Sequence, residues 1–218
     1  MKKSLLILVM TVFLCGLGAS VARANASALE AENGQILSPA GLGLQVSGNP
    51  ADLTKFKAQA AYGIAKSITV GADWYYQKDQ SQELYFNASF SPYRDSGSGY
   101  TAYLEYYPVE EEFTGLGITF WNDFNGLLYT YLNLDSSKAP LAEERETRVT
   151  PGVSLQLTPR VRVAAELAIN PANWNEGQEL RVGVGYRLAS QLTAKTNLTQ
   201  LLSGEKDRTF TAGLALEI

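Results

Sequence analysis

Apolar and polar residues alternate along the chain from about residue 41 to its last residue. In the segment ITVGADWYYQ, residues 68–77, one face carries Ile68, Val70, Ala72, Trp74 and Tyr76. A period of two is typical of a β-strand with one apolar face. The pattern predicts twelve strands, within a range of ten to fourteen, over residues 41–48, 56–65, 68–77, 83–92, 100–107, 115–122, 127–134, 148–157, 161–169, 179–188, 192–201 and 208–218. The strands at 41–48, 127–134 and 192–201 alternate less regularly than the others.

The connections between these strands come in two lengths that largely alternate. Short ones lie at residues 65–67, 122–126, 158–160 and 189–191, and longer polar ones at 47–55, 108–113, 135–146, 170–178 and 202–207. Two connections depart from the alternation, a short one at 78–82 and a long one at 94–99. With twelve antiparallel strands both chain ends fall on one side, and the longer connections fall on the other.

Two all-β folds use such a pattern, a soluble β-sandwich and a closed transmembrane β-barrel. Transmembrane strands need about 9–11 residues, and most of these segments have that length. The up-and-down order of the strands gives each residue a height along the barrel axis. At these heights, aromatic residues lie near both ends of the apolar face, with aliphatic residues between them. Such girdles mark the two membrane interfaces. They comprise Phe56, Tyr62, Trp74, Tyr76, Phe86, Tyr100, Tyr106, Phe120, Tyr186 and Phe210. The pattern therefore favours a closed antiparallel up-and-down transmembrane barrel over a secreted soluble sandwich.

Charged residues of the strands fall on the opposite face, which in a barrel lines the interior. The predicted lining includes Lys57, Asp73, Glu83, Glu105, Arg148, Arg162, Glu166, Arg181, Arg187 and Lys195. An Arg or Lys side chain facing lipid near the bilayer midplane would cost roughly 2–4 kcal/mol, so the consistent position of these charged residues on the inner face supports the assignment of the two faces of each strand. Acidic residues lie on early strands and basic ones on late strands. This indicates either a pore with a transverse field or a barrel plugged by ion pairs, in which Glu166 and Glu179 neutralise the arginines.

The first 24 residues have the pattern of a secretory signal peptide: two lysines, a short apolar run and Ala22-Arg23-Ala24. We expect a signal peptide over 1–24, a short periplasmic segment over 25–40 and the barrel over 41–218. Removing three basic residues of the signal leaves 15 basic against 22 acidic residues, a net charge of −7 that argues against a nucleic-acid partner. The only cysteine lies in the signal, so no disulfide is expected.

In hairpins such as AYGIAKSITVGADWYYQ and in its closing FTAGLALEI, the chain resembles the bacterial outer-membrane β-barrel superfamily. The resemblance implies localisation in the outer membrane, contact with its lipid, and recognition of the last strand by the barrel-assembly machinery. That closing signal usually ends in an aromatic residue, whereas this chain ends in Ile218. Twelve-stranded narrow porins for acidic sugars are similar in strand number.

The chain contains no histidine, which removes the usual general base and the commonest metal ligand. We therefore expect no enzyme activity, no cofactor and no metal, although a paired-carboxylate mechanism with Asp73 and Glu83 stays open. The acidic runs EEEF and EERE are read as solvated loop charge rather than Ca²⁺ sites. The leading hypothesis is a porin-like passive channel for small polar or charged solutes. The alternative is a plugged structural or ligand-binding barrel whose loops at 135–146 and 170–178 bind a partner.

Overall fold

The computed structural model describes residues 40–79, 82–92, 97–138, 145–172, 177–202 and 208–218. These residues form twelve strands: β1 (Leu42–Asn49), β2 (Asp52–Ala65), β3 (Ile68–Gln77), β4 (Glu83–Phe90), β5 (Ser98–Tyr107), β6 (Glu112–Phe124), β7 (Leu128–Lys138), β8 (Arg145–Thr158), β9 (Val161–Ala168), β10 (Glu179–Arg187), β11 (Leu192–Leu201) and β12 (Arg208–Glu217). No helix in this part of the chain is long and apolar enough to cross a membrane. The expected signal peptide and, apart from Ala40, the segment 25–40 lie outside the described residues.

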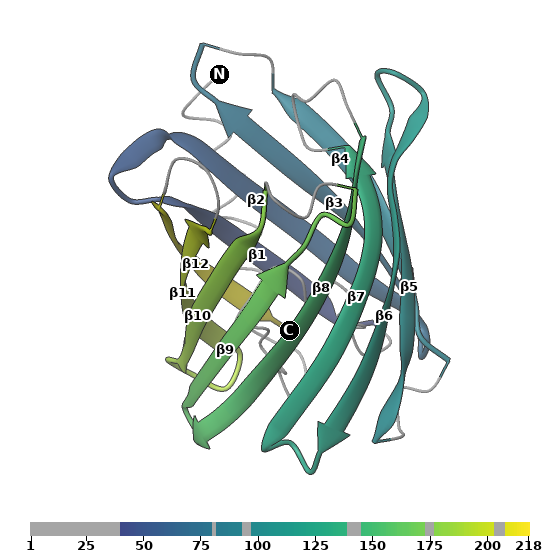
Figure 1. Ribbon diagram of the computed structural model, residues 1–218. Coiled ribbons are helices and arrows are strands. Elements are labelled where there is room, and N and C mark those ends of the chain that lie inside the picture. The colour runs from purple at the N-terminus through teal and green to yellow at the C-terminus, as the bar shows by residue number, and fades with distance from the viewer. Residues whose placement is uncertain (1–39, 80–81, 93–96, 139–144, 173–176, 203–207) are drawn as a thin grey trace.

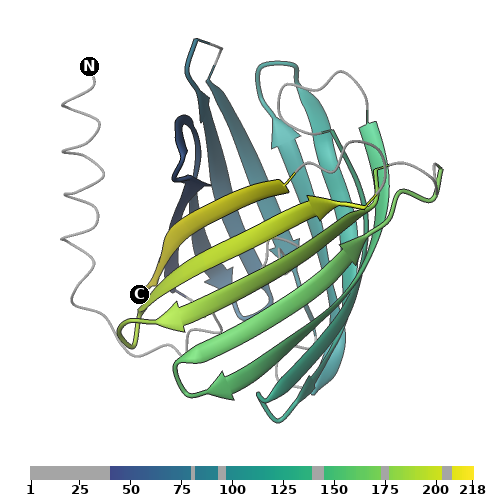
Figure 2. The ribbon, with the colours of Figure 1, turned by 60° about the vertical axis from the view of Figure 1, so that its left-hand side comes forward.

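The strands form one closed antiparallel barrel in which each strand pairs with its neighbours in sequence (Figure 1). The barrel closes where β1 pairs with β12, with Val46 opposite Leu214 and Gly43 opposite Glu217. Two backbone hydrogen bonds of 2.8 Å between Leu42 and Ile218 extend this seam to the end of the chain. Figure 2 shows the last strand beside the first, so neither terminal strand has a free edge. An unpaired edge in lipid would leave backbone groups without partners, which closure avoids.

The burial pattern is inverted relative to a soluble protein. Residues with less than a tenth of their surface exposed are mostly polar or charged, and most of them lie on the inner face. They include Thr69, Asp73, Glu83, Thr101, Thr119, Asn133, Thr150, Ser154, Glu166, Thr193 and Lys195. The outer face instead exposes large apolar side chains on most strands, such as Leu104, Leu155 and Val182 at 41–49% exposure. Water would oppose such an exterior, whereas lipid favours it.

Several strands are longer than their apolar pattern predicts. β2 begins at Asp52, β7 continues to Lys138 and β8 begins at Arg145. The predicted loops at 47–55 and 135–146 were therefore too wide, because backbone pairing continues past the last apolar side chain. The pairing of Lys138 with Arg145 shows that this hairpin projects beyond the alternating segment.

Candidate functional site

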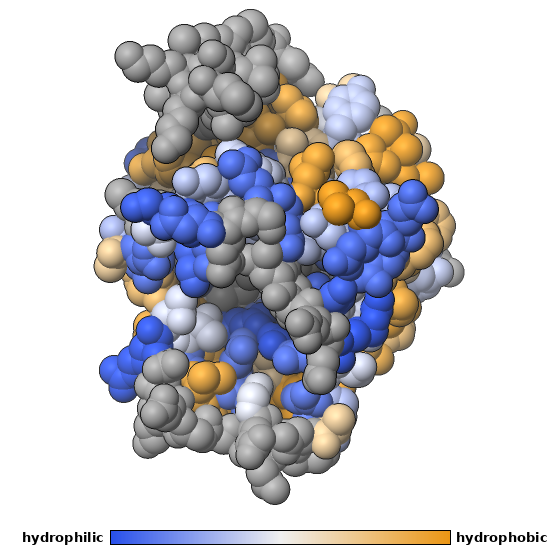
Figure 3. All heavy atoms as spheres, turned by 90° about the horizontal axis from the view of Figure 1, so that it is seen from above, coloured by the Kyte–Doolittle hydropathy of each residue, from blue (hydrophilic) through white to orange (hydrophobic). Residues whose placement is uncertain are grey.

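The inner face of the barrel is the candidate functional surface, and its two ends differ. We call the end with the longer connections, such as 108–111 and 169–178, the loop end, and the end with the short turns at 66–67 and 159–160 the turn end. Figure 3 looks onto the loop end and shows hydrophilic residues around the mouth and hydrophobic residues on the outer flank. The strand alternation therefore separates a polar interior from an apolar exterior.

The carboxylate of Asp73 is the centre of a polar cluster on β2, β3 and β4. It lies 3.1 Å from the ammonium of Lys57, accepts hydrogen bonds of 3.1 Å from the amide of Gln59, and accepts one of 3.0 Å from Asn87. Only 5% of Asp73 is exposed. Because cross-strand neighbours supply every donor, the charge is satisfied along the wall rather than across the interior.

An aromatic cluster lies next to Asp73, toward the loop end of β3, β4 and β5. The ring of Tyr85 stacks on Tyr107 at 4.9 Å between centroids and meets Tyr75 edge-on at 5.4 Å. The Tyr85 hydroxyl donates to the carboxylate of Glu83, and the ammonium of Lys57 lies 4.9 Å from the centre of the Tyr75 ring. Glu105 accepts a hydrogen bond of 3.1 Å from the hydroxyl of Thr114 on β6.

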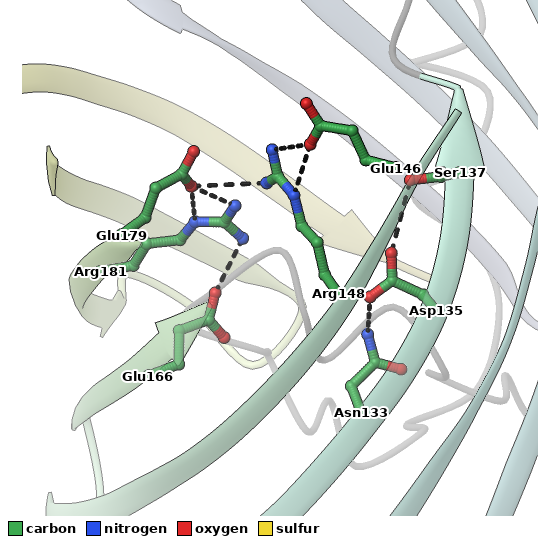
Figure 4. A network of polar contacts seen from close by, with 8 residues as sticks. All are labelled: Asn133, Asp135, Ser137, Glu146, Arg148, Glu166, Glu179 and Arg181. Carbon is green, nitrogen blue, oxygen red and sulfur yellow. Dashed lines mark hydrogen bonds and ion pairs between the residues drawn. The ribbon is translucent and has the colours of Figure 1, made fainter. Parts of the chain in front are cut away.

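A second network joins β8, β9 and β10 (Figure 4). Arg181 binds Glu166 at 3.1 Å and Glu179 at 2.5 Å. Arg148 binds Glu146 at 2.7 Å and reaches Glu179 at 3.5 Å, so Glu179 links the two guanidinium groups. This is the pairing of Glu166 and Glu179 with arginines that the plugged alternative expects. It also interleaves acids with the arginines on this wall, which reduces the transverse charge difference read from the sequence.

Large inward side chains of the central strands lie over glycines of neighbouring strands. A Cβ atom added to Gly152 would come within 2.1 Å of the Tyr131 ring, and one added to Gly117 within 2.5 Å of the Tyr103 ring. The register confirms the geometry, because Tyr131 pairs with Gly152 and Tyr103 pairs with Gly117. The Tyr131 hydroxyl then donates a 2.7 Å hydrogen bond to Glu166, one strand further on. These rings therefore run along the wall instead of projecting across the interior.

The remaining predicted lining residues lie on β9, β10 and β11 toward the turn end. The guanidinium of Arg162 donates a 3.0 Å hydrogen bond to Gln156, and the ammonium of Lys195 donates one of 3.0 Å to Gln45 across the closing seam. Arg187 is the last residue of β10 and pairs in register with Thr193. The structure thus divides the ten predicted lining residues among several groups, so they do not form one constellation.

The ten predicted girdle residues fall on the outward face of their strands. Phe56 stacks on Tyr76 at 4.8 Å and meets Trp74 edge-on at 5.2 Å, near the loop end. Tyr62 and Tyr186 are 45% and 43% exposed toward the turn end. The interfacial role of these residues stays a prediction.

Sequence reasoning missed several residues of these clusters. Tyr131 and Asp135 lie on β7, whose apolar residues on both faces hid the register, although Tyr129, Tyr131, Asn133 and Asp135 alternate on one side. Asn133 donates to Asp135 at 2.9 Å and accepts from Thr119 at 3.0 Å. Phe113 was assigned to a loop, yet it pairs with Tyr106 on the outward face, with ring centroids 5.5 Å apart.

Within the described residues, no group of three or more metal-ligating side chains is close enough to hold an ion. The acidic residues Glu110 and Glu112 instead surround the ammonium of Lys138, each at 2.9 Å. Part of the EERE run lies outside the described residues. The carboxylates of Asp73 and Glu83 each have a partner of their own, Lys57 and Tyr85 respectively.

Comparison with known proteins supports the architecture. No protein-family model and no curated protein matches the chain. Among solved structures, the KdgM porin in complex with disordered oligogalacturonate is similar with a TM-score of 0.61 and 9% identity, over 81% of this chain and 98% of that one. The Acinetobacter baumannii outer membrane protein Omp33 is similar with a TM-score of 0.55 and 12% identity, over 84% and 100% of the two chains. The fold is that of outer-membrane porins. The predicted closed antiparallel barrel is confirmed, and the soluble sandwich is excluded.

Proposed function

We propose that the protein is a porin-type passive channel of the bacterial outer membrane that conducts small polar or charged solutes. The observation that carries the proposal is the inverted burial pattern of a closed barrel, with an apolar exterior and an interior wall of polar and charged side chains. Such an interior has no role in stabilising a core by apolar packing, whereas it suits a water-filled lumen.

The arrangement of the large inward residues supports an open lumen. Tyr103 and Tyr131 lie flat over glycines, and Asp73 is satisfied by its neighbours on the wall. Side chains that meet their partners one or two strands away leave the axis clear, whereas a plug needs contacts across the barrel. The KdgM porin has the same fold and is described in complex with oligogalacturonate. That likeness supports polar solutes as a class, and it does not select one.

Conductance in a planar bilayer tests the proposal. Purified, refolded protein should produce stepwise current increases in KCl, with step size rising with salt concentration. The folded state is checked first by comparing boiled and unboiled samples in SDS gels, since a folded barrel migrates differently until it is boiled. Folded protein that inserts and gives no steps in any salt would refute the channel.

The ion-pair network of Arg148, Arg181 and their glutamates favours one second candidate, a structural barrel with a closed interior. If this is the function, Arg181→Ala should lower stability without creating or changing any conductance. If the channel proposal holds, the same variant should change the single-channel conductance, because Arg181 retains 20% of its side chain exposed on the inner face. The two candidates therefore make opposite predictions for one variant.

A further inference from the structure

The charges of the inner face are distributed unevenly along the barrel axis. Among the described inward-facing residues, the loop half holds Lys55, Glu83, Glu105, Glu112, Asp135, Glu146, Arg148, Glu166, Glu179 and Arg181. The turn half holds Asp123, Arg162, Arg187, Lys195 and Glu217. Lys57 and Asp73, paired at 3.1 Å, lie between them. The loop half thus has seven carboxylates and three inward-facing cations, with Lys138 bound to Glu112 at the hairpin end as a fourth cation, and the turn half has three cations and two carboxylates.

From this arrangement we infer that the channel proposed above is a rectifier, with an acidic loop half and a basic turn half that conduct ions unequally in the two directions. The inference rests on the proposed function, because it requires a water-filled lumen. It identifies Arg162, Arg187 and Lys195 as the residues that set the asymmetry.

The backbone places these three cations around a stretch of wall without side chains. Arg162 and Lys195 each pair in register with Gly185, from either side of β10. The backbones of Arg162 and Lys195 are thus about 10 Å apart, twice the spacing of adjacent strands. Arg187 is two residues further along β10 on the same face. Because glycine separates them, all three face the same part of the interior.

The loop half differs because carboxylates outnumber its arginines. Arg148 and Arg181 share three carboxylates, those of Glu146, Glu166 and Glu179. Glu105 on β5 and Asp135 on β7 add two further carboxylates; Glu105 accepts a hydrogen bond from Thr114, and Asp135 accepts from Asn133 and Ser137 and pairs in register with Arg148. Fixed charge in a narrow passage attracts ions of the opposite sign and raises their local concentration. Cations therefore concentrate in the loop half and anions in the turn half.

The direction of easier conduction follows from this distribution. A positive potential on the loop side drives cations from the acidic half and anions from the basic half toward the middle, where both accumulate. The opposite potential drains the middle of both. At 0.1 M salt the screening length is about 10 Å, so the halves act separately and the current ratio should be on the order of two-fold. At 1 M the length falls to about 3 Å, and the ratio should approach one.

The test is the current–voltage curve of channels inserted in one orientation, recorded at 0.1 M and 1 M KCl. The double variant Arg162→Gln/Arg187→Gln should abolish the asymmetry and shift the reversal potential in a salt gradient toward cation selectivity. Glu146→Gln, in the other half, should also reduce the asymmetry but shift the reversal potential toward anions. Arg208→Gln is the matched control for the single variant Arg162→Gln, because it removes one positive charge from the outward face of β12 and should leave the ratio unchanged.

The outcomes separate this inference from the function on which it rests. Absence of any conductance would refute the channel itself. A conducting wild-type protein with symmetric current at 0.1 M, or asymmetry that survives the double variant, would overturn the inference while the channel stands. Each variant is first shown to be folded by its heat-dependent mobility in SDS gels, and the single variant Arg162→Gln provides a milder change if the double variant does not fold.

Discussion

Replacing Gly152 by alanine tests whether the glycine keeps the Tyr131 ring on the wall. The added Cβ would lie 2.1 Å from Cζ of Tyr131 and 2.4 Å from its hydroxyl oxygen. The ring would have to retreat by about 1.4 Å to reach the carbon–carbon contact optimum of about 3.5 Å. Its only free direction is toward the interior, since the β-sheet wall lies behind Gly152.

The expected loss of unfolding free energy in Gly152→Ala has two parts. Overpacking of this kind costs about 1–3 kcal/mol. Displacing the ring also breaks the 2.7 Å hydrogen bond from Tyr131 to Glu166, and hydrogen bonds to charged groups contribute about 1.5–3 kcal/mol. We expect Gly152→Ala to lower the free energy of unfolding by about 2.5–6 kcal/mol and to reduce channel conductance, because the ring then occupies the lumen.

The assay is urea unfolding in lipid vesicles, followed by tryptophan fluorescence, together with single-channel conductance. Tyr131→Phe is the matched control, since it removes the hydrogen bond but leaves the ring over the glycine, so it should cost stability with little change in conductance. The double variant Gly152→Ala/Tyr131→Ala should recover conductance. Unchanged stability in Gly152→Ala, or failure of Tyr131→Ala to recover conductance, would refute the reasoning.

Three further predictions concern the wall itself. Asp73→Asn removes the charge that binds Lys57 and should lower unfolding stability by about 2–3 kcal/mol in urea titrations, whereas no loss would show that the cluster contributes nothing. Val153 pairs with Ala165 and Val149 with Ile169, so Pro151 of β8 lies opposite Leu167 of β9, to which it has no N–H to donate. Pro151→Val should therefore stabilise the barrel by about 1 kcal/mol, and a lower unfolding midpoint would contradict this. Val182→Arg on the outer face should cost roughly 2–4 kcal/mol in lipid, while Asn197→Arg on the inner face of the next strand should cost far less; equal costs would argue against a lipid-facing exterior.

Much of the architecture could be predicted from the alternation alone. The strands at 68–77 and 192–201 have the predicted bounds, and the order and closure of the barrel follow from the twelve-strand pattern. The reason is physical: a two-residue period in a chain that meets lipid on one side and water on the other permits few registers. β7 was harder because Leu128, Leu132 and Leu134 are interrupted by large tyrosines, which read as apolar on the other face.

The sequence by itself determined which face of each strand is apolar, since alternation is a local property of the chain. It could not determine which inward residues meet, because those contacts depend on the register between strands. The Tyr131 ring over Gly152 and the sharing of Glu179 by two arginines exist only once neighbouring strands pair in register, and the bond from Lys195 to Gln45, across residues 150 apart, exists only once the barrel closes. Likewise, the sequence order suggested a transverse charge difference, whereas the height of each residue in its strand decides that the charges also segregate along the axis.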